Sequence, residues 1–190
     1  MIGFLLASLI SSSAAASLQE LRSRMKGVNS FEAQFTQTVK QDLFPDSASV
    51  ASGRIMFTRP NKLQWIYEKP KKRLIKFDGK ELTIEDERGD KQIIRDQGRI
   101  TLERSFSFLW GEPDESLFKL EDRGASRLRL RPRRPEDVNF KWIELSIQKG
   151  RVASALVHDK LGGESLLEFQ YRGQGTLGTG NKGLPVPKVP

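Results

Sequence analysis

Apolar and polar residues alternate with a period of two along most of this chain, which is the pattern of half-buried β-strands. The first alternating segment covers residues 31–39, where one face is apolar except for Gln37. Turn signals then recur at a spacing of about 8–12 residues, which is typical of an antiparallel sheet. We predict further short strands at 53–58, 63–68, 75–77, 82–84, 93–94, 118–122, 127–131, 141–147, 151–158 and 165–171.

Two segments have helical spacing instead, with apolar residues three or four positions apart. They predict an amphipathic helix over 18–28 and a second short helix over 100–111, which ends at Gly111. A Pro/Asp/Ser turn is expected at 45–49, directly after the first strand. Because a sheet of this many strands tends to curl, helices inserted between strands would cover its concave face or its open end. The fold class predicted is mainly β (α+β), with one curved antiparallel sheet.

The N-terminus differs in composition from the rest of the chain. Residues 1–16 contain no charged side chain, and a short apolar run leads into Ala14-Ala15-Ala16, which resembles a secretory signal peptide. The run is too short to span a bilayer, which needs about 20 apolar residues. No Lys or Arg precedes the run, so a buried N-terminal helix is the alternative. We predict a signal peptide at 1–16, a single domain at 17–171 and a Gly/Pro-rich tail at 172–190.

Composition removes several classes of chemistry. The 190 residues include no Cys and one His, which excludes disulfide scaffolds, Cys-zinc sites, iron–sulfur clusters, thiol nucleophiles and anchoring through an N-terminal cysteine. The His158-Asp159 pair is not preset as a catalytic relay, because adjacent residues of a strand point to opposite faces. The acidic run 85–87 lacks the spacing of a calcium loop. We expect no catalytic site, no metal site and no cofactor, and we predict that the protein is not an enzyme.

The chain is basic, with 32 Lys and Arg against 24 Asp and Glu, which gives a net charge of +8. Arg127, Arg129 and Arg131 share one face of a predicted strand, opposite Leu128 and Leu130. Such a stripe could contact phosphates, anionic lipid headgroups or an acidic protein, or it could be an ordinary solvated face. A secreted protein meets little DNA, so we expect no nucleic acid among its partners.

Large apolar side chains gather on the inferred inner faces of neighbouring strands, where they either form an ordinary core or line a cavity. They are Phe57, Leu63, Trp65, Tyr67 and Phe77. Arg59 has the same parity as Ile55 and Phe57, which puts a guanidinium at the rim of this apolar face. A charge in that position needs a partner, and carbonyl oxygens at the C-terminal end of a covering helix would serve.

The chain resembles the periplasmic outer-membrane lipoprotein carrier family, LolA, from about residue 18 to residue 171. The most specific match is the segment 52–65, which reads S-G-R-I-M-F-T-R-P-N-K-L-Q-W. The first strand contributes F-E-A-Q-F-T-Q at 31–37, and D-G-K-x-L follows at 78–82. The resemblance implies an incomplete, strongly curved antiparallel β-barrel, with short helices as a lid over a hydrophobic cavity.

Membership of this family would make the protein a periplasmic chaperone. The resemblance implies that it takes acylated lipoproteins from an inner-membrane ABC exporter and hands them to an outer-membrane receptor, where one is present. It also implies that Arg59 latches the lid and that Leu63 and Trp65 line the cavity. With the inferred inner faces added, the expected cavity lining is Phe35, Ile55, Phe57, Leu63, Trp65, Tyr67, Phe77, Phe106 and Leu109. We expect a monomer.

Two other functions stay open from the sequence. One is a relative on the same fold that carries or senses other lipids or glycolipids. The other is a basic secreted protein that binds polyanions through the arginine stripe. The segment 173–190 also contains no Phe, whereas the family usually ends with a Phe-rich strand.

Overall fold

One curved antiparallel sheet dominates the computed structural model, which describes residues 13–41, 44–95, 106–124 and 126–176. Within these residues, one α-helix and two short 3-10 helices accompany the strands. The elements are α1 (Ser13–Met25), β1 (Val28–Gln41), β2 (Phe44–Thr58), β3 (Lys62–Lys69), β4 (Arg73–Phe77), β5 (Leu82–Asp86), β6 (Lys91–Ile94), η1 (Ser107–Trp110), β7 (Phe118–Asp122), β8 (Arg127–Pro132), η2 (Pro135–Asp137), β9 (Phe140–Gln148), β10 (Arg151–Asp159) and β11 (Glu164–Thr176).

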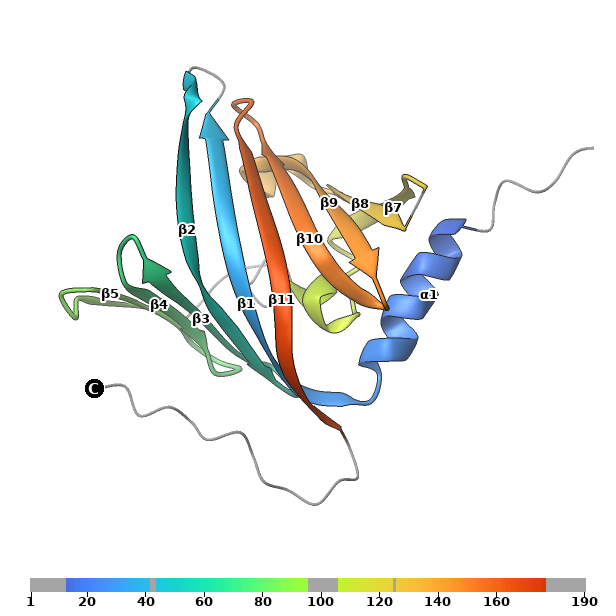
Figure 1. Ribbon diagram of the computed structural model, residues 1–190, viewed down its shortest axis with the longest axis horizontal. Helices are drawn as coiled ribbons and strands as arrows, with labels where there is room; N and C mark the ends of the chain where they lie inside the picture. Colours follow the sequence, from blue (N-terminus) through green and yellow to red (C-terminus); the bar gives the residue numbers. More distant parts are fainter. Residues whose placement is uncertain (1–12, 42–43, 96–105, 125, 177–190) are drawn as a thin grey trace, which may run out of the picture.

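The 11-stranded sheet has the order β6-β5-β4-β3-β2-β1-β11-β10-β9-β8-β7. The first and last strands of the chain, β1 and β11, therefore pair in the middle of the sheet. β6 and β7 follow one another along the chain but form opposite edges, so the connection between them must cross the sheet. The described part of this connection, residues 106–117, carries η1, which lies on the concave side (Figure 1).

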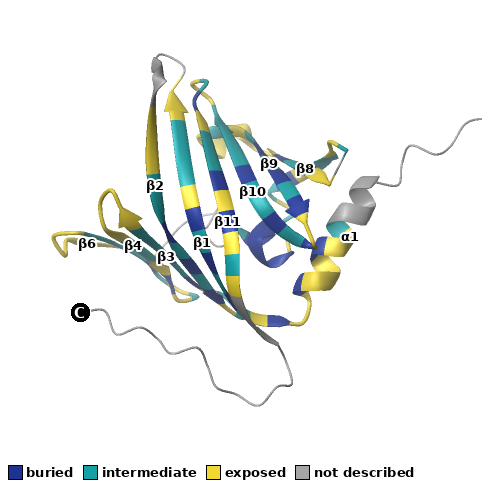
Figure 2. Cartoon of the chain, viewed as in Figure 1, coloured by how far each residue is buried: buried dark blue, intermediate teal, exposed yellow. Residues whose placement is uncertain are grey.

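The hydrophobic core occupies the concave side of the sheet. Alternation along β1 turns Phe31, Ala33 and Phe35 inward, while Glu32 and Gln34 are only half buried. α1 packs against β7, β8 and β10 and buries Leu21 and Met25. Each fully buried Leu or Phe side chain contributes roughly 1.5–3 kcal/mol. Figure 2 shows η1 as a buried element behind the sheet, and α1 with exposed residues on its outward side.

The structure confirms the mainly β class and the single curved antiparallel sheet. The four strands predicted between residues 118 and 158 begin and end within one residue of their observed bounds. The predicted helix over 18–28 is displaced, because α1 covers Ser13–Met25 and Val28 already belongs to β1. The signal peptide stays a prediction, since residues 1–12 lie outside the described residues.

Three further element predictions need correction. The turn expected at 45–49 lies inside β2, because Gln41 already pairs with Phe44. The helix expected over 100–111 is a short 3-10 helix, η1, in its described part, and residues 100–105 lie outside the described residues. β11 continues to Thr176, beyond the expected end at residue 171, because β1 provides a pairing partner for its glycine-rich end.

Candidate functional site

The predicted cavity-lining residues all meet in one apolar cluster on the concave side. They come from the inner faces of β1 to β4 and from the segment 106–110. The buried members are Phe35, Ile55, Phe57, Leu63, Trp65, Phe77 and Leu109, and the half-buried members are Tyr67 and Phe106. We call the members on the sheet the apolar floor, and we call residues 106–112, which include η1, the cover.

The cover packs onto the apolar floor through aromatic rings. Trp110 stacks on Phe57, with ring centroids 4.4 Å apart and the planes 4° from parallel. Phe106 meets the edge of Trp65 at a centroid distance of 4.9 Å. All four residues of η1 are buried. In this conformation the protein's own side chains therefore occupy the part of the concave side where these rings pack.

Of the aromatic residues in this cluster that were not expected to line the cavity, two lie against Phe57. Trp110 lies on the helical face that predicted the helix over 100–111, so the same pattern could have identified it. Phe31 shares the parity of Phe35 on β1, and its ring lies 5.4 Å from that of Phe57. Both residues enlarge the apolar surface that the sequence pattern indicated.

Arg59 lies directly after β2 and joins three parts of the molecule. Its Nε donates to the carbonyl oxygen of Val28 at 2.9 Å, and its Nη2 donates to the carbonyl oxygen of Met25 at 3.4 Å. Met25 is the last residue of α1, where carbonyl oxygens carry the negative end of the helix dipole. The third contact is an ion pair of 3.0 Å with Glu112 in the cover. The guanidinium thus connects α1, the start of β1 and the cover.

Further contacts hold α1 close to the cover. Gly111 follows η1 with a φ of 82°, a conformation that glycine adopts without strain. A Cβ at this position would collide with Met25 and crowd the Leu21 carbonyl oxygen, so α1 and the cover approach closely here. Arg22 of α1 also pairs with Glu115, just beyond the cover. The end of α1 and the cover therefore form one packed unit above the apolar floor.

The sequence matches the family described as outer membrane lipoprotein carrier protein LolA over residues 26–176. The chain belongs to this family. It is 29% identical over 170 residues to the outer-membrane lipoprotein carrier protein of Cupriavidus taiwanensis, covering 82% of this chain and 76% of that relative. It is 28% identical over 179 residues to the protein of the same name from Methylibium petroleiphilum, covering 91% of this chain and 87% of that relative.

A solved structure of a LolA superfamily protein from Nitrosomonas europaea also resembles this chain. The TM-score is 0.48 and the sequence identity is 11%, with 84% of this chain and 92% of that chain covered.

This LolA-family chain also has a hollow on the convex side of its sheet. The hollow encloses about 290 Å³ and has a largely polar lining. The lining residues are Gln34, Phe35, Thr36, Ser52, Gly53, Glu68, Glu168 and Gln170. Acyl chains bury poorly against such groups, since carboxylates and amides lose their hydration there. The apolar floor is the surface suited to lipid.

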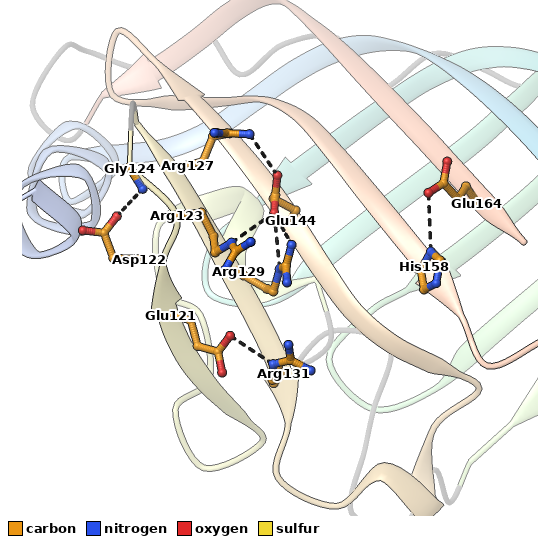
Figure 3. A network of polar contacts seen from close by, with 10 residues as sticks. All are labelled: Glu121, Asp122, Arg123, Gly124, Arg127, Arg129, Arg131, Glu144, His158 and Glu164. Carbon is orange, nitrogen blue, oxygen red and sulfur yellow. Dashed lines mark hydrogen bonds and ion pairs between the residues drawn. The ribbon is translucent and has the colours of Figure 1, made fainter. Parts of the chain in front are cut away.

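The arginine stripe of the LolA-family chain lies on the outer face of β8, where acidic residues partly neutralise it. Figure 3 shows Glu144 surrounded by Arg123, Arg127 and Arg129. The nearest of these contacts joins Arg129 Nη2 to a Glu144 carboxylate oxygen at 2.8 Å. Arg131 pairs with Glu121 at 3.0 Å. The stripe is therefore less available to a polyanion than the sequence pattern indicated.

No helix among the described residues is long and apolar enough to cross a membrane. The same part of the chain contains no group of three or more acidic, His or Cys side chains that could hold a metal ion.

Proposed function

We propose that this protein is a periplasmic carrier that binds the acyl chains of lipoproteins on its apolar floor and transfers them from the inner to the outer membrane. The observation that carries the proposal is the continuous apolar floor, on which one short cover packs. Family membership and the names of the relatives agree with it.

The energetics of lipid transfer support a site of this kind. Each CH₂ group of an acyl chain gains roughly 0.8 kcal/mol when it leaves water. A lipidated protein therefore cannot cross an aqueous compartment unless an apolar surface shields its chains. Acyl chains would reach the apolar floor by displacing the aromatic rings of the cover. The loss of the ring contacts offsets part of the free energy gained when the acyl chains are buried, and this allows release.

In this proposal Arg59 is the latch of the lid formed by α1 and the cover. Its three contacts hold the covered conformation, and their loss accompanies cargo entry. The latch needs no covalent chemistry, because two conformations separated by a few kcal/mol exchange through hydrogen bonds and packing alone.

The partners follow from the same proposal. The protein receives acylated lipoproteins from an inner-membrane ABC exporter and delivers them to an outer-membrane receptor. It acts in the periplasm as a monomer. The net charge of +8 favours docking to acidic surfaces of these partners.

The proposal is tested by uptake of a fluorescent triacylated lipopeptide in the absence of detergent. Leu63 lies on the apolar floor with 1% of its surface exposed, whereas its neighbour Gln64 faces the other side of β3. We expect Leu63→Glu to lose at least tenfold in uptake, because a carboxylate on the floor repels acyl chains. The matched control Gln64→Glu should retain uptake.

Co-elution of the lipopeptide with the protein in size-exclusion chromatography measures uptake. Circular dichroism reports whether each variant is folded, and Leu63→Gln provides an uncharged second variant. Equal uptake by folded Leu63→Glu and Gln64→Glu would contradict the assignment of the apolar floor as the cargo site.

A further inference from the structure

A chain of hydrogen bonds crosses the concave face where the apolar floor ends. The Tyr67 hydroxyl donates to Gln37 Oε1 at 3.0 Å, and Gln37 Nε2 donates to Ser165 Oγ at 2.8 Å. The three residues come from β3, β1 and β11. We call Tyr67, Gln37 and Ser165 the polar belt. Gln37 is the polar exception that the alternating pattern placed on the inner face of the first strand.

Two small residues on β2 make this chain of hydrogen bonds possible. In the sheet register, Gly53 lies between Tyr67 of β3 and Phe35 of β1, and Ala51 lies beside Gln37. Neither carries a side chain long enough to separate the Tyr67 hydroxyl from the Gln37 amide. The polar belt is therefore continuous over β3, β2, β1 and β11.

The polar belt and the Arg59 latch lie at opposite ends of the apolar floor. Arg59 binds the carbonyl oxygen of Val28, at the start of β1. Gln37 follows nine residues later on that strand, a distance of roughly 30 Å at about 3.3 Å per residue. Phe31 and Phe35 lie on the inner face between them. Acyl chains lying along the floor would therefore end at polar groups on this side.

The polar belt has more donors than it uses within the described part of the chain. The Gln37 amide has two N–H groups, of which one reaches Ser165, and the Ser165 hydroxyl has a proton of its own. Both residues are half buried, so a ligand can reach them. Water can hydrate these donors in the free protein, and a ligand oxygen can take the place of that water.

Trp65 adds a second, independent indication of a ligand. Its indole N–H is buried and has no hydrogen-bond partner among the described residues, although the residue is only 3% exposed. Trp65 lies on the apolar floor two residues before Tyr67, and the two rings are 6.4 Å apart. A buried donor without an acceptor carries a free-energy cost. A ligand oxygen at the end of the floor would remove this cost.

We infer that the polar belt, together with the Trp65 indole N–H, binds the carbonyl oxygens through which acyl chains are joined to the cargo. This inference rests on the proposed function and names the part of the cargo that the site recognises. Carbonyl oxygens are acceptors without a charge, which suits donors at the end of an apolar floor. The carbonyls come either from glycerol esters or from an amide-linked acyl chain.

Competition between matched lipids tests the inference. The reporter is diphenylhexatriene, which fluoresces in apolar sites and has no hydrogen-bonding group. The competitors are dioctanoylglycerol, its ether analogue dioctylglycerol, which lacks carbonyls, and N-octyloctanamide. We expect the wild-type protein to favour the ester over the ether about three- to tenfold more than the Gln37→Leu variant does. Comparing the ratio between variants cancels the difference in solubility of the two lipids.

The controls separate the polar belt from the apolar floor. Gln34→Leu makes the same substitution on the outer face of β1 and should keep the wild-type ratio. Ser165→Ala should lower the ratio as Gln37→Leu does, and both variants should bind the ether as the wild type does. If the wild type prefers only the amide, the polar belt binds the carbonyl oxygen of the amide-linked chain. If the wild type prefers the ester, the polar belt binds the carbonyl oxygens of the glycerol esters.

Two results would overturn the inference, and they are distinguishable. In the first, both lipids bind, but the ester-to-ether ratio is equal in the wild type and in Gln37→Leu. The polar belt would then not be part of the cargo site, and the proposed function would stand. Failure of the wild-type protein to bind the reporter or any of the lipids would contradict the proposed function itself.

Discussion

Arg59 and Tyr171 are two polar residues near the apolar floor that differ in how their polar atoms are satisfied. Arg59 has partners in α1, β1 and the cover, and 23% of its side chain is exposed. The Tyr171 hydroxyl is buried without a hydrogen-bond partner among the described residues. Burial raises the pKa of Tyr171 far above its usual value, although the Arg151 guanidinium lies 5.1 Å from the ring and acts in the opposite direction.

Tyr171→Phe should therefore leave the stability at pH 8 unchanged or raise it by about 1 kcal/mol, because it removes an unpaired buried hydroxyl. Below pH 10, about the pKa of an unfolded tyrosine, both folded and unfolded chains keep the proton. Above it, the unfolded chain ionises first, so wild-type stability falls as the pH rises. The variant should lose less stability between pH 9 and pH 11, measured by urea unfolding. Equal losses would contradict the burial of this hydroxyl.

The sequence located the polar residues of the site better than their partners. Parity placed Arg59 at the rim of the apolar face and Gln37 on the inner face, because alternation depends only on neighbouring residues. Their contacts depend on the pairing of distant strands. Ser165 is 128 residues from Gln37, and Glu112 is 53 residues from Arg59.

Among the elements, a strand was predictable from the sequence where the alternation of buried and exposed residues alone determines it. Along β8 the alternation of Arg and Leu gives both the strand and its buried face. The turn expected at 45–49 was wrong because pairing with β1 overrides local turn propensity. Among the described residues, the part of β2 before Ser52 pairs with β1 but not with β3.

The cover is an element whose stability should control access to the floor. Glu112→Gln removes the ion pair with Arg59, and 60% of the Glu112 side chain is exposed, so the loss should stay below about 1 kcal/mol. The covered conformation competes with cargo, and this loss should raise the apparent affinity for an acyl probe by up to about fivefold. Fluorescence titration measures it, and an unchanged or lower affinity would contradict competition by the cover.

Arg59→Leu removes all three contacts of the latch. We expect this variant to bind the lipopeptide at least as tightly as the wild type, because less of the protein is covered. Release should then be slower, since the covered conformation that displaces cargo is less stable. Transfer of bound lipopeptide to acceptor vesicles measures this step. Wild-type transfer rates would contradict the latch role of Arg59.

Over the molecule as a whole, the arginine stripe lies on an outer face that contains its own acidic partners. Glu144 alone contacts Arg123, Arg127 and Arg129, and 16% of its side chain is exposed. The Arg129 guanidinium also lies 4.2 Å from the ring centre of Trp142, which stacks on His158 at 4.9 Å. Such fixed positions suit a structural role on the outer face better than adaptable contacts with a polyanion.

Glu144→Gln should release these arginines and strengthen polyanion binding. We expect the variant to leave a heparin column at higher salt than the wild type, because more positive charge becomes available. Glu121→Gln, which frees Arg131, is the matched control and should shift elution less. Elution of Glu144→Gln together with the wild type would show that Glu144 does not mask the stripe.

The two edges of the sheet have a consequence for the size of the cargo. β6 and β7 have no partner beyond β5 and β8 within the described residues, so no hydrogen bonds close the sheet on itself. A closed barrel has a diameter fixed by its strand number and stagger. Here the radius can widen through small changes in twist between neighbouring strands, with every ladder hydrogen bond retained. We therefore expect the circumference to adjust to its contents, so that one scaffold would take cargoes with fewer or more acyl chains.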